Sequence, residues 1–427
     1  MCVASKISRA DGPDTGSRGQ RGALSAIFAV HGFMFASWAV RIPAVKQQTG
    51  ASAAALGLAL LGLSAGAVAT MLLAGALCRR FGSRQLTVLS CALLSLTLVL
   101  PPLAHSAFML GLALLVFGAA YGCLNVAMNS VAVDVVAAMG RPVMPAFHAA
   151  WSFGGLAGAG IGGLIAARLS PLPHLALICL AGLTVTVVAG RLLLAHPVPA
   201  AQQDSGDSPA SAWRRALSTG RLVGVLGLIA LCAAYDEGAI GDWGALHLRQ
   251  DLGAGAGLAA AGYAAFALAE AIGRLYGTAL LERHGRTRVL TAGGLIACGG
   301  MLLAALAPDI WLALAGFAAT GLGLANLFPV AVARAGLLAG SAGVALTSTL
   351  GYGGFLLGPP AIGFLASDFG LPAGLTTLSF LAFGAALVAK LSGRTNQPRT
   401  PRPRRFSPLV SPGRDAVQPG NSYRTGQ

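Results

Sequence analysis

The stretch Leu231-Cys-Ala-Ala-Tyr-Asp-Glu-Gly-Ala-Ile-Gly-Asp-Trp-Gly-Ala-Leu246 places three carboxylates, Asp236, Glu237 and Asp242, in a segment that is otherwise apolar enough to cross a lipid bilayer. An ionised side chain near the bilayer centre costs at least ~2.5–3.5 kcal/mol on insertion scales, so such residues normally face a bundle interior or a water-filled cavity. The stretch therefore predicts an all-α membrane protein whose helices surround a polar route.

The composition of the whole chain supports this interpretation. Hydrophobic residues make up 55% of the 427 residues and charged residues 10%, with a mean hydropathy of +0.72, whereas soluble domains carry about 25% charged residues. Apolar runs of about twenty residues are long enough for the ~30 Å hydrocarbon core. Twelve such runs predict twelve transmembrane helices, at 22–41, 53–77, 86–104, 107–132, 145–168, 174–194, 222–247, 256–281, 288–307, 310–333, 342–366 and 371–391.

The basic residues indicate how these spans are oriented. An even number of spans puts both termini on one side, and cytoplasmic loops of membrane proteins carry an excess of arginine and lysine. With both termini inside, the inner loops hold Arg79, Arg80, Arg84, Arg141, Arg214, Arg215, Arg283, Arg286, Arg288 and Arg334, and the outer loops hold Arg41, Lys46, Arg168 and Arg249. The net charge of +15 is therefore assigned to membrane topology, and no nucleic-acid partner is expected.

The chain divides into two halves of six spans each. Its predicted parts are a cytoplasmic N-terminal segment (1–21), a first six-helix bundle (22–194), a cytoplasmic linker (195–221), a second bundle (222–391) and a disordered basic cytoplasmic tail (392–427). The halves repeat each other at an offset close to 200 residues, since Gly154-Gly-Leu-Ala-Gly158 in the fifth span corresponds to Gly354-Phe-Leu-Leu-Gly358 in the eleventh. One six-span unit is used twice, which predicts two pseudo-symmetric bundles. Small residues four apart let helices pack closely, so we interpret the glycine runs as packing devices.

A second repeated motif lies in the loops after the second and eighth spans. Its residues are Gly75, Arg80, Gly82 and Arg84 in the first copy and Glu282, Arg283, Gly285 and Arg286 in the second. This pattern resembles the signature loop of the major facilitator superfamily, and the resemblance covers roughly residues 20–392. It implies the family's fold of two six-helix bundles and a cytoplasmic gate in which an acidic residue helps to hold the halves together. Arg79 stands where the first copy should have that acid.

Three further stretches narrow the resemblance. Ser37-Trp-Ala-Val-Arg-Ile-Pro43, Glu237-Gly-Ala-Ile-Gly-Asp-Trp243 and Gly351-Tyr-Gly-Gly-Phe-Leu-Leu-Gly-Pro-Pro360 are similar to an uncharacterised bacterial inner-membrane branch near the fucose permeases. The location this implies is the bacterial cytoplasmic membrane. The branch does not define a substrate, because folds host many functions.

The intramembrane charges are the candidate substrate and proton residues. Glu237 is the leading candidate for a coupling carboxylate, because changes in solvent access can switch the protonation of a buried acid. Asp236 and Asp242 lie on other faces of a regular helix, and Asp242 is equally well explained as a hydrated residue near the outer surface. Glu270 precedes Arg274 by four residues, which favours a same-face ion pair; a structural pair and a clamp for a substrate carboxylate are both open.

Polar and aromatic residues in other spans complete the set. His31 and His148 are candidates for proton relay or ligand binding, and Asn125 and Asn129 share a helix face and offer amide groups; bonds between helices explain all four equally well. The aromatic residues that offer rings for stacking on a solute are Trp38, Trp151, Trp243, Tyr121 and Tyr352; anchoring at the membrane interface explains Trp38 and Trp243 equally well.

These residues predict a secondary active transporter that moves a small organic solute by alternating access. Without a Walker-type glycine loop, energy would come from an ion gradient, with the proton as the expected coupling ion. Proton-linked uptake of a sugar or metabolite and efflux of a drug or metabolite are both open. A membrane-embedded enzyme or a pore is a weaker alternative. We expect no enzyme activity, no cofactor, no metal and a monomer in the bilayer.

The topology can be tested with reporter tags. Tags at residue 205 and after residue 400 should both report the cytoplasm, and a tag at 308–310 should report the periplasm, because twelve spans separate the termini. Linker and tail tags on opposite sides of the membrane would contradict this prediction.

Overall fold

The computed structural model describes residues 13–51, 53–166, 168–195, 220–254 and 256–394, and every regular element among them is a helix. Most of the predicted linker, most of the predicted tail and the first twelve residues lie outside the described residues. The predicted disorder of the tail therefore stays a prediction.

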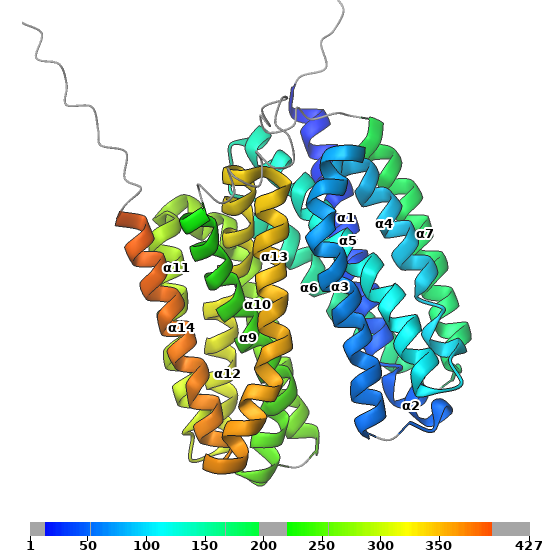
Figure 1. Ribbon diagram of the computed structural model, residues 1–427. Coiled ribbons are helices and arrows are strands. Elements are labelled where there is room, and N and C mark those ends of the chain that lie inside the picture. Colours follow the sequence, from blue (N-terminus) through cyan, green and yellow to red (C-terminus); the bar gives the residue numbers. More distant parts are fainter. Residues whose placement is uncertain (1–12, 52, 167, 196–219, 255, 395–427) are drawn as a thin grey trace, which may run out of the picture.

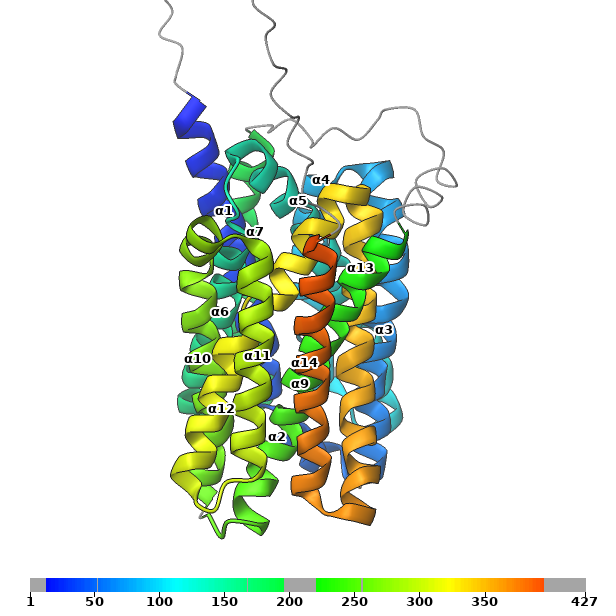
Figure 2. The same ribbon diagram turned by 90° about the vertical axis from the view of Figure 1, so that its left-hand side faces the viewer.

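The helices fall into two groups that stand side by side (Figures 1 and 2). The first contains α1 (Pro13–Ala39), α2 (Ile42–Thr49), α3 (Ala53–Phe81), α4 (Ser83–Thr97), the 3-10 turn η1 (Pro101–Leu103), α5 (Ala107–Met139), α6 (Met144–Ala166) and α7 (Pro171–Ala195). The second contains α9 (Gly220–Gln250), α10 (Ala256–His284), α11 (Arg286–Ala305), α12 (Ile310–Leu324), α13 (Leu327–Phe369) and α14 (Leu371–Arg394).

The membrane-spanning character predicted from hydropathy is confirmed. Ten stretches of the described residues are long and apolar enough to cross a bilayer. One of them, Ile310–Ala366, is 57 residues long and corresponds to the tenth and eleventh predicted spans. Non-helical backbone at Ala339 and Gly340 divides it, and Gly340 takes a φ of 56° that suits glycine. The fifth predicted span corresponds to the 23-residue α6, which is not among the ten.

The internal repeat predicted from the glycine motifs appears as repeated helix packing. In the first group α1 packs on α6, α3 on α5 and α4 on α7; in the second group α9 packs on α13, α10 on α12 and α11 on α14. In order of the spans, the pairs are 1 with 5, 2 with 4 and 3 with 6 in the first group, and 7 with 11, 8 with 10 and 9 with 12 in the second. The second group therefore repeats the three pairings of the first. There are two large hydrophobic cores. The core around Phe117 and Phe147 lies mainly in the first group and also takes in residues of α13, and the core around Phe266 and Phe317 lies in the second group.

Glycines make the closest of these pairings possible. A Cβ atom added to Gly154 of α6 would overlap the carbonyl group of Ala29 in α1, and one added to Gly354 of α13 would overlap the carbonyl group of Leu231 in α9. The two glycines are repeat partners, and both touch backbone, which cannot move aside as a flexible side chain can. The predicted packing role of the glycine runs therefore has a direct structural basis.

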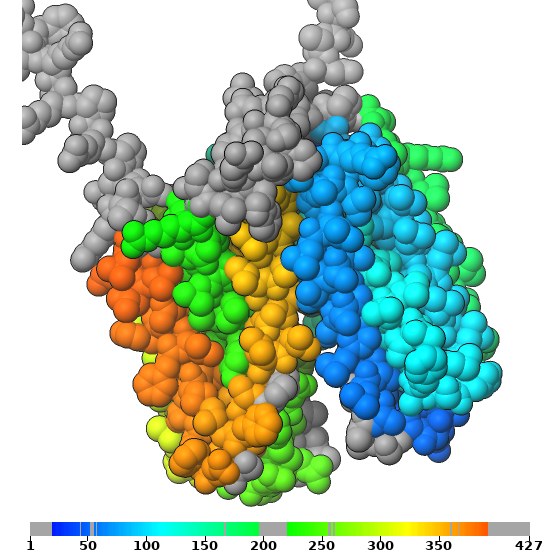
Figure 3. Space-filling view, in the orientation of Figure 1, coloured from blue at the N-terminus to red at the C-terminus, as the bar shows by residue number. Residues whose placement is uncertain are grey.

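The two groups are joined most clearly near the end that carries the start of α1 and the end of α14. There, Ser341 Oγ of α13 donates to the carbonyl oxygen of Gly75 in α3 at 3.0 Å, and Thr278 Oγ1 of α10 donates to the carbonyl oxygen of Pro142 at 3.2 Å. At the opposite end a groove separates α3 from α13 (Figure 3). The interface between the two groups is therefore closed at one end and open at the other; we call these the closed end and the parted end.

Replacing Gly154 with valine should destabilise the protein by about 1–3 kcal/mol, because the new side chain must push α1 away from α6. Gly160→Val is a matched control on the same helix, since no atom lies within 4 Å of a Cβ there. Thermal unfolding in detergent should show a lower midpoint for Gly154→Val only. Equal losses in both variants would mean that helix propensity, not close packing, explains the glycine.

Candidate functional site

A cavity of about 240 Å³ lies between the two groups of helices. Its walls come from both groups, so it lies at the interface between them. The lining residues are Phe28 and Phe35 of α1, Leu63 and Ser64 of α3, Tyr121, Asn125 and Met128 of α5, His148 and Trp151 of α6, Glu237 of α9, Tyr263 and Arg274 of α10, and Phe328, Tyr352 and Phe355 of α13.

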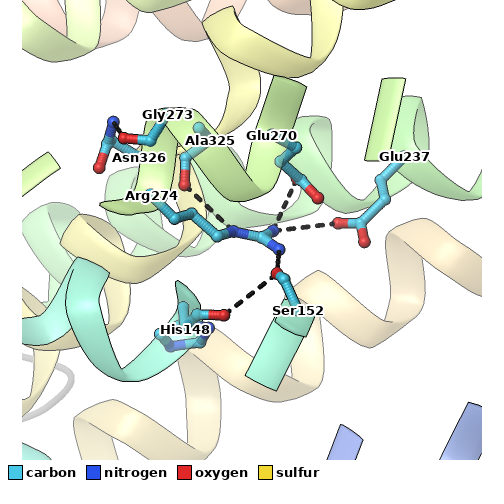
Figure 4. A network of polar contacts seen from close by, with 8 residues as sticks. All are labelled: His148, Ser152, Glu237, Glu270, Gly273, Arg274, Ala325 and Asn326. Atoms are coloured by element: carbon cyan, nitrogen blue, oxygen red, sulfur yellow. Dashed lines mark hydrogen bonds and ion pairs between the residues drawn. The ribbon is translucent and has the colours of Figure 1, made fainter. Parts of the chain in front are cut away.

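Arg274 is the centre of the polar network in this cavity (Figure 4). Its guanidinium donates to Glu270 Oε1 at 2.6 Å and to Ser152 Oγ of α6 at 2.6 Å. The Ser152 hydroxyl in turn donates to the His148 carbonyl oxygen at 3.1 Å. Arg274 belongs to the second group of helices and Ser152 to the first, so this network crosses the interface between the groups.

A break in the tenth predicted span supplies another acceptor. Pro329 has no N–H to donate to the carbonyl four residues earlier, and the chain leaves the helix between α12 and α13 at that point. The carbonyl concerned, that of Ala325, accepts from Arg274 Nε at 3.4 Å. Next to it, Asn326 Nδ2 donates to the Gly273 carbonyl oxygen at 3.1 Å. The break before Pro329 therefore leaves a backbone carbonyl free to accept a hydrogen bond from Arg274 of the neighbouring helix α10.

Glu237 is the second carboxylate beside Arg274, and it is held more loosely. Its Oε2 atom lies 3.7 Å from Arg274 Nη2, against 2.6 Å for Glu270. The side chain of Glu237 is 16% exposed and that of Glu270 is 5% exposed. Glu237 also lines the cavity directly, so it is the carboxylate with access to a solute or to water.

The other two carboxylates of α9 do not line the cavity. The helix is continuous over Gly220–Gln250, so the three acids point in different directions, as regular helix geometry predicts. Asp236 is buried in the second group, 1% exposed, and its Oδ1 atom has no hydrogen-bond partner. Asp242 is exposed.

The predicted histidines and asparagines of the first group form a second set of contacts. His148 Nε2 lies 3.2 Å from Asn129 Oδ1, and Asn129 Nδ2 donates to the Asn125 carbonyl oxygen at 2.8 Å. Asn125 and His148 line the cavity, whereas His31 lies behind it, fully buried, with its ring 4.2 Å from that of Tyr121. Asn129 acts as a bridge to His148 and does not line the cavity.

Aromatic rings form most of the remaining wall. Sequence reasoning singled out Tyr121, Trp151 and Tyr352, and all three line the cavity; Trp38 is instead buried in the first core, and Trp243 packs against the second. It missed five aromatic residues of the lining, Phe28, Phe35, Tyr263, Phe328 and Phe355, and also Ser152. Apolar rings in membrane spans carry no signal that separates a cavity wall from a lipid-facing position.

The second copy of the gate motif contacts the first half of the chain. Glu282 accepts from Arg141 at 2.7 and 3.2 Å, and Arg141 lies in the loop between α5 and α6. The hydrogen bond to Glu282 raises the pKa of the Arg141 guanidinium. Arg283 and Arg286 are exposed, and Gly285, with a φ of 76°, is the residue before α11.

The first copy of the motif makes a different contact. The carbonyl oxygen of Gly75 accepts from Ser341 across the interface, and Gly82, with a φ of 86°, precedes α4 as Gly285 precedes α11. Arg80 is exposed with its guanidinium 5.4 Å from the ring centre of Phe81, and Arg84 is half-buried. Arg79 stands where this copy should have an acid. The contact that this copy makes across the interface is instead the hydrogen bond from the Ser341 hydroxyl to the Gly75 carbonyl oxygen.

No group of three or more histidine, cysteine, aspartate and glutamate side chains suited to a metal ion occurs among the described residues. The site instead consists of one arginine, two carboxylates, amides and aromatic rings. Two repeated helix bundles with such a cavity between them are the architecture of a secondary transporter.

Comparison with known proteins agrees with this class. The family model of the Major Facilitator Superfamily matches residues 23–236 and 226–420. The chain is 35% identical over 371 residues to an uncharacterized MFS-type transporter of Yersinia pestis, covering 86% of this chain and 91% of that protein. It is 32% identical to the membrane protein MosC of Rhizobium meliloti, covering 86% and 88%. The chain belongs to the major facilitator superfamily.

Solved structures show the same fold. The transporter FucP in an outward conformation aligns with a TM-score of 0.75 over 87% of this chain and 97% of that chain, at 16% identity. The fucose:proton symporter FucP of E. coli, in a variant form, aligns with a TM-score of 0.72 at 17% identity. At this identity the likeness concerns the fold, and it places the chain structurally near the fucose permeases, as its motifs predict.

Arg274→Met should strongly destabilise the protein, because it leaves two carboxylates in the interface without their cation; breaking a buried pair costs about 3–5 kcal/mol. Adding Glu270→Gln should restore much of the loss, since Glu270 is the more buried and more tightly bonded partner. Adding Glu237→Gln instead should restore less, because Glu237 reaches the cavity. The thermal midpoints of the two double variants in detergent test this ranking, and the reverse order would contradict it.

Proposed function

We propose that this protein is a secondary active transporter that moves a small organic solute across the bacterial inner membrane by alternating access, coupled to protons through Glu237. The observation that carries the proposal is the Arg274 network in the cavity between the two bundles. A solute bound there touches both bundles, so it can influence how they move relative to each other.

The closed end and the parted end support the alternating-access mechanism. The contacts of Ser341 with Gly75, of Thr278 with Pro142 and of Glu282 with Arg141 hold one end together. With both termini in the cytoplasm, as the positive charges indicate, the groove between α3 and α13 faces the periplasm. Rocking of the bundles would break these contacts and expose the cavity to the cytoplasm.

Arg274 binds Glu270 more closely than it binds Glu237, and this difference supports proton coupling. Arg274 keeps Glu270 at 2.6 Å and meets Glu237 at 3.7 Å. A proton on Glu237 would end its attraction to the guanidinium without disturbing the tighter pair. Protonation of Glu237 would thereby change the charge of the cavity while the rest of the network stays in place.

Uptake of a sugar or metabolite and efflux of a drug or metabolite are both forms of this activity. The protein would act without a cofactor, and a monomer contains the whole cavity. A pore is the alternative to separate first, because a carrier saturates and supports counterflow, whereas a pore does neither.

Glu237→Gln should abolish accumulation of the solute driven by a proton gradient, because glutamine keeps the size and hydrogen bonding of the side chain and cannot take up a proton. Counterflow between equal solute pools needs no net proton movement, so it should fall only as far as the variant weakens binding of the solute. Asp242→Asn is the matched control, an exposed acid on the same helix, and should accumulate solute normally. Both activities are measured in reconstituted vesicles. Gradient-driven accumulation that is unchanged in a stably folded Glu237→Gln protein would remove the coupling role.

A further inference from the structure

The charges at the cavity do not balance. Arg274 and Glu237 line it, and Glu270 lies directly behind Arg274. One guanidinium thus faces two carboxylates, and the described lining contains no second lysine or arginine. His148 also lines the cavity, but Arg274 is bonded to Ser152, whose hydroxyl donates to the His148 carbonyl oxygen, so a second positive charge on His148 would be repelled. When both acids are ionised, the cluster carries one surplus negative charge.

Arg274 is poorly placed to receive an anionic solute. Its Nη2 is occupied by Glu270, its Nη1 by Ser152, and its Nε by the Ala325 carbonyl oxygen. These bonds use three of the five N–H groups of the guanidinium, and a carboxylate or phosphate entering the cavity would have to compete with Glu237 for the remaining ones. Anions are therefore disfavoured chiefly by charge, because they would add to the surplus negative charge of the cluster.

The wall of the cavity suits a positive charge. Aromatic rings attract cations through the negative potential of their faces. Tyr352 lies at the centre of a chain of rings, 6.0 Å from Tyr121 and 6.0 Å from Phe355, measured between ring centres. Tyr121, Tyr263 and Tyr352 line the same cavity as Glu237. One loosely held carboxylate surrounded by rings is the chemistry that recognises an organic ammonium group.

We propose that the solute is a small organic cation, an amine or quaternary ammonium group on an apolar body, and that its charge replaces a proton on Glu237. This inference rests on the proposed transport function and specifies its substrate class. An unbalanced buried charge is costly, so the empty cluster neutralises itself by holding one proton. Entry of the cation turns the carboxylic acid into a carboxylate paired with the ammonium group, and the proton leaves to water. The transport cycle is then an exchange of one proton for one monovalent cation.

The size of the cavity limits the solute. Its volume of about 240 Å³ is below the ~300–1,000 Å³ of typical sites for drug-sized ligands. Choline and benzyltrimethylammonium are suitable probes, because each carries a quaternary ammonium group on a small body. The neutral alcohol 3,3-dimethylbutan-1-ol has the shape of choline without its charge, and benzoate supplies the opposite charge.

Calorimetric titration of the purified protein in detergent tests the inference without transport. Both cations should bind at least about tenfold more tightly than the neutral alcohol, as expected for a charge held by a carboxylate and rings. Benzoate should not bind. Titrations repeated in buffers with different ionisation enthalpies should reveal release of up to one proton per bound cation. That release should disappear in Glu237→Gln and persist in the Asp242→Asn control.

A second variant tests the aromatic wall of the cavity without changing Glu237. Phe355→Leu retains an apolar side chain and removes a ring, so it should weaken binding of the cations more than binding of the neutral alcohol. Failure of both cations to bind, equal affinity for the neutral alcohol, or cation binding unchanged by Glu237→Gln would each overturn the inference. Saturable transport and counterflow of a neutral or anionic solute would then leave the transporter function standing. Vesicles that show no saturable transport of any solute would remove the proposed function itself.

Discussion

The ion pairing of Arg274 in the interface between the bundles is the constraint on which the site depends. A guanidinium in a membrane interior is tolerable only with a counter-charge and acceptors for its N–H groups. Glu270 supplies the charge from the same helix, Ser152 supplies a hydroxyl from the other bundle, and the break before Pro329 supplies a carbonyl. Three separate segments of the chain are thus shaped to satisfy one side chain.

The same constraint gives the site its chemistry. Glu270 is enough to neutralise Arg274, so Glu237 is left as a surplus acid at the edge of the cavity. An acid of this kind can be neutralised by a proton or by a cationic solute, and the competition between the two would couple their movements. Because the cavity is lined by both bundles, this exchange at Glu237 would change the contacts between the bundles and so favour their movement relative to each other.

Most of the fold can be predicted from the sequence, because span length, hydropathy and the glycine motifs depend on residues that are near one another along the chain. The positions of the spans and the pairing of Gly154 and Gly354 in repeated helix contacts are examples. The bond between Glu270 and Arg274 also follows from a spacing of four. The approach of Glu237 and Ser152 to Arg274 does not, since these residues lie on three different helices and only the packing of α6, α9 and α10 brings them together. Sequence spacing did indicate that Asp236 lies on another helix face than Glu237, but not that it would be buried in the second group of helices.

The most direct test of the account is to measure both ends of the protein at once. Spin labels at Ala138 and His284 report the closed end, and labels at Gln48 and Gln250 report the parted end; all four side chains are exposed. Alternating access predicts that conditions which lengthen the first distance shorten the second, as pH and solute are varied in lipid vesicles. Distances that change together, or that stay fixed under all conditions, would contradict the claim that the bundles rock around the Arg274 site.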